Sequence, residues 1–345
     1  MTVTEAQVRE ALKQVKFPGL SRDIVSFGFV KGVTVDDDTV TVEITFTSAN
    51  PDAGAQIERA ARATLEELPG VAAVSLTVNN SQPQAAPARP QLLPGVKTKI
   101  AVASGKGGVG KSTVAANLAL ALRQLDYTVG LLDADVYGPS QQIMMGCRER
   151  PLVNEREKIV PVDGHGVQVM SLGFLIEPDT PVVWRGPMVM KALQQFLEDV
   201  EWGTLDVLVV DLPPGTGDAQ LTITQLIPLD GVVIVTTPQD IALIDARKGL
   251  AMFQKVNVPV LGIVENMATF VCPHCGKESE IFKRGGGKRT AEQLGVPFLG
   301  EVPLDPAVVA GGDTGTPIVA AAPGSAAAMA FVAIARAVAE ATKSR

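Results

Sequence analysis

The sequence has little of what a membrane or secreted protein needs. No uncharged apolar stretch approaches the roughly 20 residues of a membrane-spanning helix. The opening MTVTEAQVRE lacks the charged start and apolar run of a signal peptide. Three cysteines among 345 residues do not make a disulfide framework. We therefore expect a cytoplasmic protein that does not bind membranes.

Basic clusters and aromatic residues are also scarce. The formal net charge is −7 and no basic block is present, which argues against a general nucleic-acid binder. Aromatic residues make up 4% of the chain, whereas glycine and alanine are plentiful. Because 46% of the residues are hydrophobic, the chain can bury a large core. This composition is typical of a tightly packed α/β protein.

The first 80 residues predict a small α+β domain. A helix is expected at 4–16, where Thr4 can cap the first turn, and a second helix at about 52–68. Strands are expected at 23–35, 38–46 and 71–79. Residues 81–97, rich in proline, alanine and glutamine, predict a semi-extended linker.

Residues 98–345 alternate between strand and helix signals. Helices are expected at 111–125, 240–255 and 325–342, the last one packed on a sheet rather than inserted in a membrane. Continuous apolar runs, as in strands buried on both faces, occur at 97–104, 127–135, 167–173, 205–214, 230–238 and 258–266. The pattern predicts a doubly wound parallel sheet with ligands at the carboxyl ends of its strands.

A phosphate-binding loop follows the first of these strands. Gly105-x-x-x-x-Gly110-Lys111-Ser112 matches the P-loop pattern and precedes a predicted helix. Glycines let successive backbone N–H groups converge on phosphates, and the helix N-terminus adds to their attraction. Lys111 supplies a charge for the β- and γ-phosphates, and Ser112 offers a hydroxyl to Mg²⁺. The alternative is a glycine-rich turn without a ligand.

Carboxylates end two of the predicted strands. Asp211 is expected to bind a Mg²⁺ ion, either directly or through a bound water. Asp133 and Asp135, two positions apart at a strand end, are expected to point to the same side and face the phosphates. One of them could hold a Mg²⁺-bound water and the other, nearer the loop, could orient the attacking water. For Asp135 the alternative is a cap on the following turn.

Lys106 is a second lysine in a loop that needs only one. It is either a solvated loop residue or a cation that reaches the phosphates held by a second subunit. A cation supplied in this way can stabilise the charge of the transition state, as arginine fingers do.

Cys272 and Cys275 form a C-x-x-C pair after the strand ending near residue 266. Most structural zinc or [4Fe–4S] sites take four ligands, so these two thiolates would supply half of them. A twofold dimer would supply the other half. A redox disulfide and a zinc site without cluster transfer remain alternatives. We expect Cys147 to be a packed thiol rather than a ligand, and His274 not to be a ligand.

Longer motifs carry a family resemblance. GKGGVGKST resembles the deviant phosphate loop of the MinD/ParA/nitrogenase-iron-protein superfamily, whose signature lysine falls on Lys106. The stretches DADVYGPS, WRGPM, WGTLDVLVVDLPPGTGDAQLT, VENMATFVCPHCG and VPLDPAVVAGGDTGTP together resemble the Mrp/ApbC family of iron–sulfur cluster carrier ATPases. Residues 1–80 are similar to the SufT/PaaD-like domain often fused to bacterial members.

The resemblance implies roles for individual residues. It implies catalytic roles for Lys106 and Asp135, and contact of Asn266 with the adenine. Cluster ligation is implied for Cys272 and Cys275. It gives Arg185 a place in a motif but no physical role. Nucleotide binding is implied for Gly105, Lys106, Gly107, Gly108, Val109, Gly110, Lys111, Ser112, Thr113 and Asn266, and Mg²⁺ binding for Ser112, Asp133 and Asp211.

The implied function is a slow ATPase that uses ATP and Mg²⁺. It would carry a labile [4Fe–4S] cluster at the interface of a homodimer and transfer it to apo-proteins. Its expected partners are apo iron–sulfur proteins and a cluster-assembly scaffold, with no nucleic acid and no membrane. A ParA/MinD-type positioning ATPase would explain Lys106 but not the cysteine pair. A nucleotide-dependent small-molecule enzyme needs neither feature.

Overall fold

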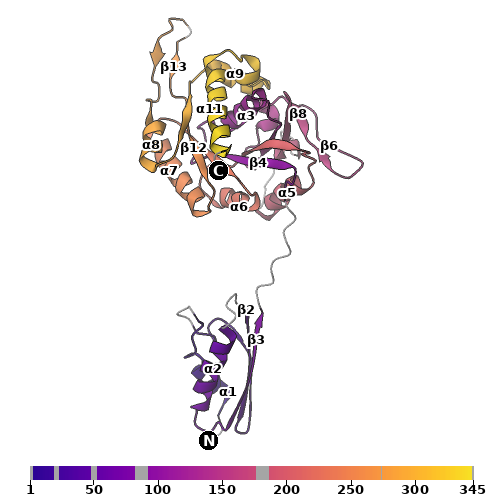
Figure 1. Cartoon of the computed structure of the whole chain (residues 1–345), viewed down its shortest axis with the longest axis vertical. Helices are drawn as coiled ribbons and strands as arrows, with labels where there is room; N and C mark the ends of the chain where they lie inside the picture. The colour runs from indigo at the N-terminus through magenta and orange to yellow at the C-terminus, as the bar shows by residue number, and fades with distance from the viewer. Residues whose placement is uncertain are drawn as a thin grey trace. The chain divides into compact units, whose positions relative to one another are not determined.

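The computed structural model describes residues 3–18, 23–47, 53–81, 92–175, 186–272 and 274–343. The chain forms two compact units, Met1–Pro90 and Gln91–Arg345 (Figure 1). Each unit buries a hydrophobic core of its own. The boundary falls inside the range expected for the linker, although β3 still includes Ser81 and the next strand begins at Val96.

The N-terminal unit is the expected α+β domain. It contains α1 (Glu5–Leu12), β1 (Val30–Asp36), β2 (Thr39–Thr47), α2 (Ala53–Glu66) and β3 (Ala73–Ser81). The sheet order is β1-β2-β3, with β1 antiparallel and β3 parallel to β2. Thr4 caps α1 as predicted, in a reciprocal pair with Gln7.

The first strand begins later than the sequence suggests. Residue 23 forms an isolated bridge with residue 16, residues 24–28 form turns, and β1 starts only at Val30. The Asp23 carboxylate accepts hydrogen bonds from the backbone N–H and the hydroxyl of Ser26, each 2.7 Å long. This local bonding competes with strand pairing. Ile24 is nevertheless fully buried, so the apolar signal was real but belonged to a packed turn.

The C-terminal unit is built on a doubly wound sheet. Its strand order is β15-β12-β11-β4-β10-β5-β9-β8, and every neighbouring pair is parallel except β8 and β9. The sheet strands are β4 (Val96–Ser104), β5 (Val129–Asp133), β8 (Val162–Gly164), β9 (Val167–Ser171), β10 (Leu205–Asp211), β11 (Gly231–Thr236), β12 (Val260–Asn266) and β15 (Phe298–Val302). The predicted fold class is confirmed.

Helices cover both faces of this sheet. Figure 1 shows α5, α6 and α7 along one side of β4, and α3 and α11 along the other. The helices are α3 (Lys111–Gln124), α4 (Gln141–Met144), α5 (Gly186–Glu198), α6 (Asp218–Leu226), α7 (Asp240–Lys255), α8 (Gly286–Leu294), α9 (Pro306–Thr314), α10 (Ile318–Ala321) and α11 (Ala326–Lys343), with the 3-10 helix η1 (Leu172–Leu175). Two small hairpins pair β6 (Leu152–Val153) with β7 (Ile159–Val160), and β13 (Phe270–Val271) with β14 (Glu278–Ser279).

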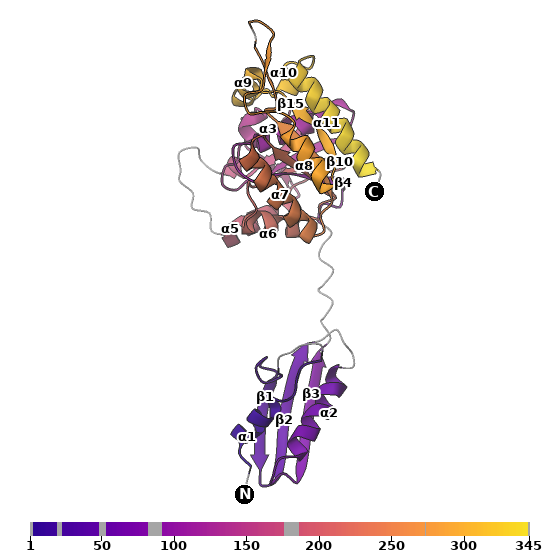
Figure 2. The same ribbon diagram turned by 90° about the vertical axis from the view of Figure 1, so that its left-hand side faces the viewer.

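The C-terminal helix packs on the sheet as expected. α11 lies against α3 and β15 (Figure 2). Its Phe331 and Ile334 are buried. Met329 of the same helix is exposed. In the part of the chain that the structure describes, no helix combines the length and the apolar character needed to cross a bilayer.

The topology brings the candidate residues to one edge of the sheet. β10 lies between β4 and β5, and Asp211 pairs in register with Asp133. β4 runs directly into the P-loop and α3. β12 ends at Asn266 and leads into the β13–β14 hairpin, which carries the cysteine pair.

Candidate functional site

The P-loop glycines serve two purposes. Gly108 and Gly110 have φ of +80° and +81°, in the left-handed region that side chains avoid. A Cβ atom added at Gly107 or Gly108 would meet nothing within 4 Å, so the loop presents open backbone there. At Gly105 a Cβ atom would lie 2.1 Å from the Asp245 carbonyl oxygen of α7. The loop therefore exposes its middle and packs tightly at its entry.

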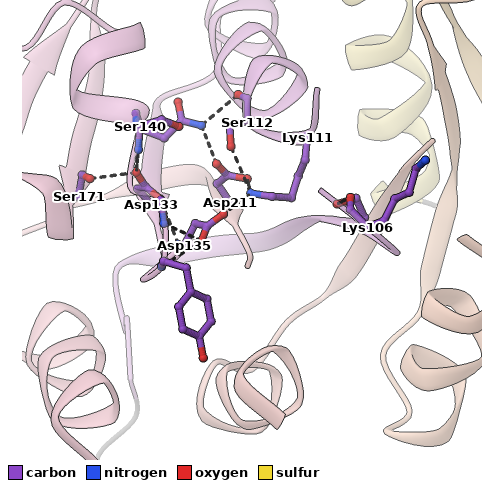
Figure 3. A network of polar contacts seen from close by, with 12 residues as sticks. Lys106, Lys111, Ser112, Asp133, Asp135, Ser140, Ser171 and Asp211 are labelled. Atoms are coloured by element: carbon purple, nitrogen blue, oxygen red, sulfur yellow. Dashed lines mark hydrogen bonds and ion pairs between the residues drawn. The ribbon is translucent and has the colours of Figure 1, made fainter. Parts of the chain in front are cut away.

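Lys111 is buried among carboxylates. Its ammonium nitrogen donates a short hydrogen bond to Asp211 Oδ1 and lies 3.4 Å from Asp135 Oδ2 and 3.2 Å from Ser112 Oγ (Figure 3). Burial acts to lower the pKa of Lys111, but the charges of Asp211 and Asp135 outweigh it and raise the pKa. The lysine is thus a fixed cation at the carboxyl ends of the strands, and its contact with phosphates stays a prediction.

Only Asp133 stands on the strand, because β5 ends there, so strand alternation does not place Asp135. Both carboxylates nevertheless act on Lys111, and their contact with phosphates stays a prediction. Asp133 faces the start of α4: its Oδ2 accepts hydrogen bonds from Ser140 N, Gln141 N and Ser171 Oγ, at 2.8 to 3.0 Å. Burial, with Asp211 nearby, raises the pKa of Asp133 to about 7.

Asp135 faces the P-loop and also stabilises a turn. Its Oδ2 approaches Lys111, whereas its Oδ1 accepts hydrogen bonds from Tyr137 N and Gly138 N at 3.2 and 3.3 Å. The turn cap considered from the sequence is present, and the role of Asp135 in orienting a water stays a prediction. The backbone donors fix the carboxylate, and this fixed geometry suits a group that must orient a water.

Gln141 is a site residue that the sequence analysis missed. The side chain is completely buried, and its Nε2 donates to Asp211 Oδ2 (2.8 Å) and to the Ser112 carbonyl oxygen (3.0 Å). It stands at the first position of a four-residue helix, outside every recognised motif. No signal in the sequence pointed to this position, because its contacts depend on how the loop after β5 folds back.

Asn266 hydrogen-bonds to the backbone of the P-loop. Its Nδ2 donates to the Val109 carbonyl oxygen at 2.9 Å, and a Cβ atom at Gly110 would lie 2.2 Å from that nitrogen. The end of β12 thereby touches the loop directly. The predicted contact of Asn266 with an adenine stays a prediction.

Lys106 stands apart from the carboxylates. In Figure 3 its side chain extends away from Lys111 and the aspartates. Its backbone is held because Ser104 Oγ donates to the Lys106 carbonyl oxygen at 2.9 Å. Among the residues that the structure describes, its ammonium group has no ion-pair or hydrogen-bond partner.

The cysteine pair lies on the β13–β14 hairpin, which projects from the unit (Figure 1). Cys272 N donates to Lys277 O, and Gly276 N donates to Cys272 O, so the turn is closed by backbone bonds of 3.0 and 2.9 Å. Cys275 is exposed and Cys272 partly so. Hydrogen bonds from the backbone N–H groups of His274 and Cys275, and from the Cys275 thiol, lower the pKa of Cys272.

The cysteine pair has no third metal ligand beside it among the described residues. Within the described ranges, no group of three or more histidine, cysteine, aspartate or glutamate side chains is placed to hold a metal ion. Cys147 packs against the core, and burial raises the pKa of its thiol to about 11, as suits a packed thiol. Arg185 lies outside the described residues.

Two family matches cover most of the chain. Residues 95–339 match the family described as NUBPL iron-transfer P-loop NTPase, which is more than half of the chain. The chain belongs to this family. Residues 5–76 match the iron–sulfur cluster assembly protein family, so the NUBPL-type NTPase unit follows an assembly-type domain. The resemblance noted in the sequence is confirmed.

Named relatives and solved structures agree with this membership. The Arabidopsis thaliana iron–sulfur protein required for NADH dehydrogenase is 57% identical over 68% of this chain and 75% of its own. A Synechocystis iron–sulfur cluster carrier protein is 45% identical over 98% of both chains.

An Archaeoglobus fulgidus nucleotide-binding protein, solved with ADP, is 39% identical with a TM-score of 0.57, over 64% of this chain and 87% of its own. The Pyrococcus furiosus cell division ATPase MinD, 24% identical with a TM-score of 0.56 over 70% of this chain and 98% of its own, shares the fold.

Proposed function

We propose that this chain is an ATP-dependent carrier of iron–sulfur clusters. It binds and slowly hydrolyses ATP, holds a labile [4Fe–4S] cluster between two copies of itself, and delivers the cluster to apo-proteins in the cytoplasm. The observation that carries the proposal is the projecting hairpin with Cys272 and Cys275, on the same unit as a P-loop. The relatives named as cluster carriers support it.

ATP is the substrate of the P-loop. The exposed backbone at Gly107 and Gly108 suits phosphate oxygens, and Lys111 suits their charge. When phosphates attract Lys111, its contacts with Asp211 and Asp135 loosen. Asp135 is then available to orient the attacking water, and Lys106 of a second copy stabilises charge on the transferred phosphoryl group.

The residues at this edge also fit a Mg²⁺ ion. Ser112 and Asp211 would hold it, and Asp133, whose Oδ2 already accepts three hydrogen bonds, would act through a bound water. The fit rests on the buried Asp211 carboxylate and the Ser112 hydroxyl. It also rests on the buried Gln141 Oε1, which has no hydrogen-bond partner among the described residues. Bound there, the ion would neutralise phosphate charge.

The cluster is cargo held by thiolates. A [4Fe–4S] cluster takes four cysteines, and one hairpin offers two. A twofold axis would bring the second pair. The depressed pKa of Cys272 favours the thiolate that ligates iron, and exposure of the pair allows transfer to an acceptor.

Anaerobic reconstitution with iron and sulfide tests this proposal. Cys272→Ala and Cys275→Ala should each abolish stable cluster binding, measured by visible absorption and iron counting, and leave ATP binding intact. Cys147→Ala is the control and should retain the cluster. We expect about one cluster per dimer. A full cluster on a proven monomer, or loss of the cluster only in the Cys147 variant, would refute the assignment.

A further inference from the structure

The buried amide of Gln141 has one side without a partner. Its Nε2 donates to Asp211 Oδ2 and to the Ser112 carbonyl oxygen. Both of these oxygens only accept hydrogen bonds, so chemistry requires that the amide nitrogen face them. Its Oε1 must therefore point the other way. That oxygen is buried and has no hydrogen-bond partner among the described residues.

A buried amide oxygen is rarely left unpaired in a native protein, because it has given up its hydrogen bonds with water. The partner that it lacks must be a donor. The surroundings narrow the choice: Asp211, Asp133 and Asp135 make this edge strongly acidic, and Lys111 already pairs with two of them. Phosphate oxygens are acceptors and cannot bond to Oε1, whereas the waters around a divalent cation are strong donors.

We propose that Gln141 is a positioning residue for the divalent cation that accompanies ATP. Its Nε2 fixes the Asp211 carboxylate, and its Oε1 accepts a hydrogen bond from a water bound to the cation. The inference rests on the proposed nucleotide function and adds to it a residue outside the P-loop and the aspartate motifs.

The Gln141 amide contributes more to holding Asp211 in place once nucleotide is bound. Among described side chains, Asp211 accepts hydrogen bonds from Lys111 on one oxygen and from Gln141 on the other. Phosphates compete for Lys111. Gln141 is then the donor that continues to hold Asp211 in place, so its loss should affect the cation-bound state more than the cation-free state.

Equilibrium binding separates these states. A fluorescent ADP analogue is titrated with EDTA or with Mg²⁺, and Mn²⁺ affinity in the presence of ADP is measured by electron paramagnetic resonance. Gln141→Met keeps the length of the side chain and removes both polar atoms. We expect about tenfold weaker Mn²⁺ binding and a smaller gain in ADP affinity from Mg²⁺. ADP affinity in EDTA should change little.

Gln142→Met is the matched control. This neighbouring glutamine donates to the Pro139 carbonyl oxygen and shares the Ser171 hydroxyl with Asp133, with no contact to Asp211. It should retain the wild-type Mn²⁺ affinity. Equal losses in both variants would mean a general disturbance of α4 and would overturn the inference.

A second substitution covers the case in which Gln141→Met folds poorly. Gln141→Asn keeps a polar amide in this acidic site but shortens the side chain by one methylene, so it should hold Asp211 less firmly and bind Mn²⁺ more weakly than the wild type. Unchanged Mn²⁺ affinity in either folded variant would refute the inference. If the wild type itself fails to bind ADP, the proposed nucleotide function fails instead.

Discussion

Side chains at the site are paired in ways that a bound nucleotide must rearrange. Lys111, the cation expected on the phosphates, is neutralised by Asp211 and Asp135. Removal of one member of a buried charge cluster leaves the others uncompensated. Substitutions here therefore act on both stability and chemistry, and binding has to be measured separately from turnover.

Asp135→Asn should separate the two. The amide keeps the size of the side chain and loses the negative charge that would orient a water for attack. We expect ATP binding to persist and hydrolysis to fall by about 10²–10⁴-fold. Calorimetric titration with ATP and a phosphate-release assay measure the two effects. Lys111→Ala, which removes the cation expected on the phosphates, should weaken ATP binding. An equal loss of binding in Asp135→Asn would show that Asp135 is a structural or metal residue.

Acid should weaken the C-terminal unit through Asp206. Hydrogen bonds from Lys97, and then from Thr128, lower the pKa of this carboxyl below its ordinary value of 3.8. A depressed folded-state pKa gives stability that is present above pH 3.8 and lost as the pH falls through the folded pKa. Urea denaturation between pH 6 and pH 2.5 should show a shallower acid decline in Asp206→Asn. An unchanged slope would contradict this linkage.

Site residues that belong to a sequence motif were predictable, whereas a residue that reaches the site only because a loop folds back was not. Lys111, Ser112 and Asp211 meet as the sequence predicts, because a P-loop and an adjacent strand end fix their positions. The loop that follows β5 folds back and brings the Gln141 side chain into hydrogen-bonding contact with Asp211. Neither periodicity nor spacing contains that information.

At the scale of elements, β12 joins the two candidate sites. Asn266 at its end bonds the P-loop, and the neighbouring Glu265, fully buried, accepts hydrogen bonds from Gly285 N and Gly287 N at the start of α8. The cysteine hairpin lies between these two anchors in the sequence. One rigid strand end therefore positions both the phosphate loop and the hairpin exit.

The P-loop entry is fixed by close packing on α7. Gly105→Ala would place a methyl group 2.1 Å from the Asp245 carbonyl oxygen, so backbone must move. We expect a loss of about 1–3 kcal/mol in the free energy of unfolding, measured in urea without nucleotide. Gly107→Ala is the matched control, since nothing lies within 4 Å of its added atom. Equal free energies of unfolding for the two variants would show that the α7 backbone shifts at little cost in stability.

The buried strands were the most predictable elements. Continuous apolar runs gave β4, β5, β9, β10, β11 and β12, because strands covered on both faces need such side chains. The antiparallel edge strand β8 and the β13–β14 hairpin were not foreseen. Both are short, and turn bonding rather than an apolar pattern defines them.

At the scale of the whole molecule, the proposed function requires a second copy to complete two features. Lys106 has no ion-pair partner among the described residues, and the described residues supply no third ligand next to Cys272 and Cys275. Both lie on the C-terminal unit, which has its own core. A single twofold axis through this unit would satisfy both, so nucleotide and cluster would be linked through one interface.

Mixing inactive subunits tests whether Lys106 acts across that interface. Lys106→Ala should bind ATP almost normally, because Lys111 is intact, and should lose hydrolysis. Asp135→Ala should lose hydrolysis for a different reason.

In a heterodimer of the two variants, both defects fall on the site inside the Asp135→Ala subunit. The other site keeps its own Asp135 and receives an intact Lys106 from its partner. Mixed dimers should therefore recover turnover in a phosphate-release assay, up to about one active site per dimer by the same argument. Exchange of subunits has to be verified by two affinity tags. If verified heterodimers stay as inactive as each parent, Lys106 does not act in trans, and the twofold arrangement loses its link to the nucleotide.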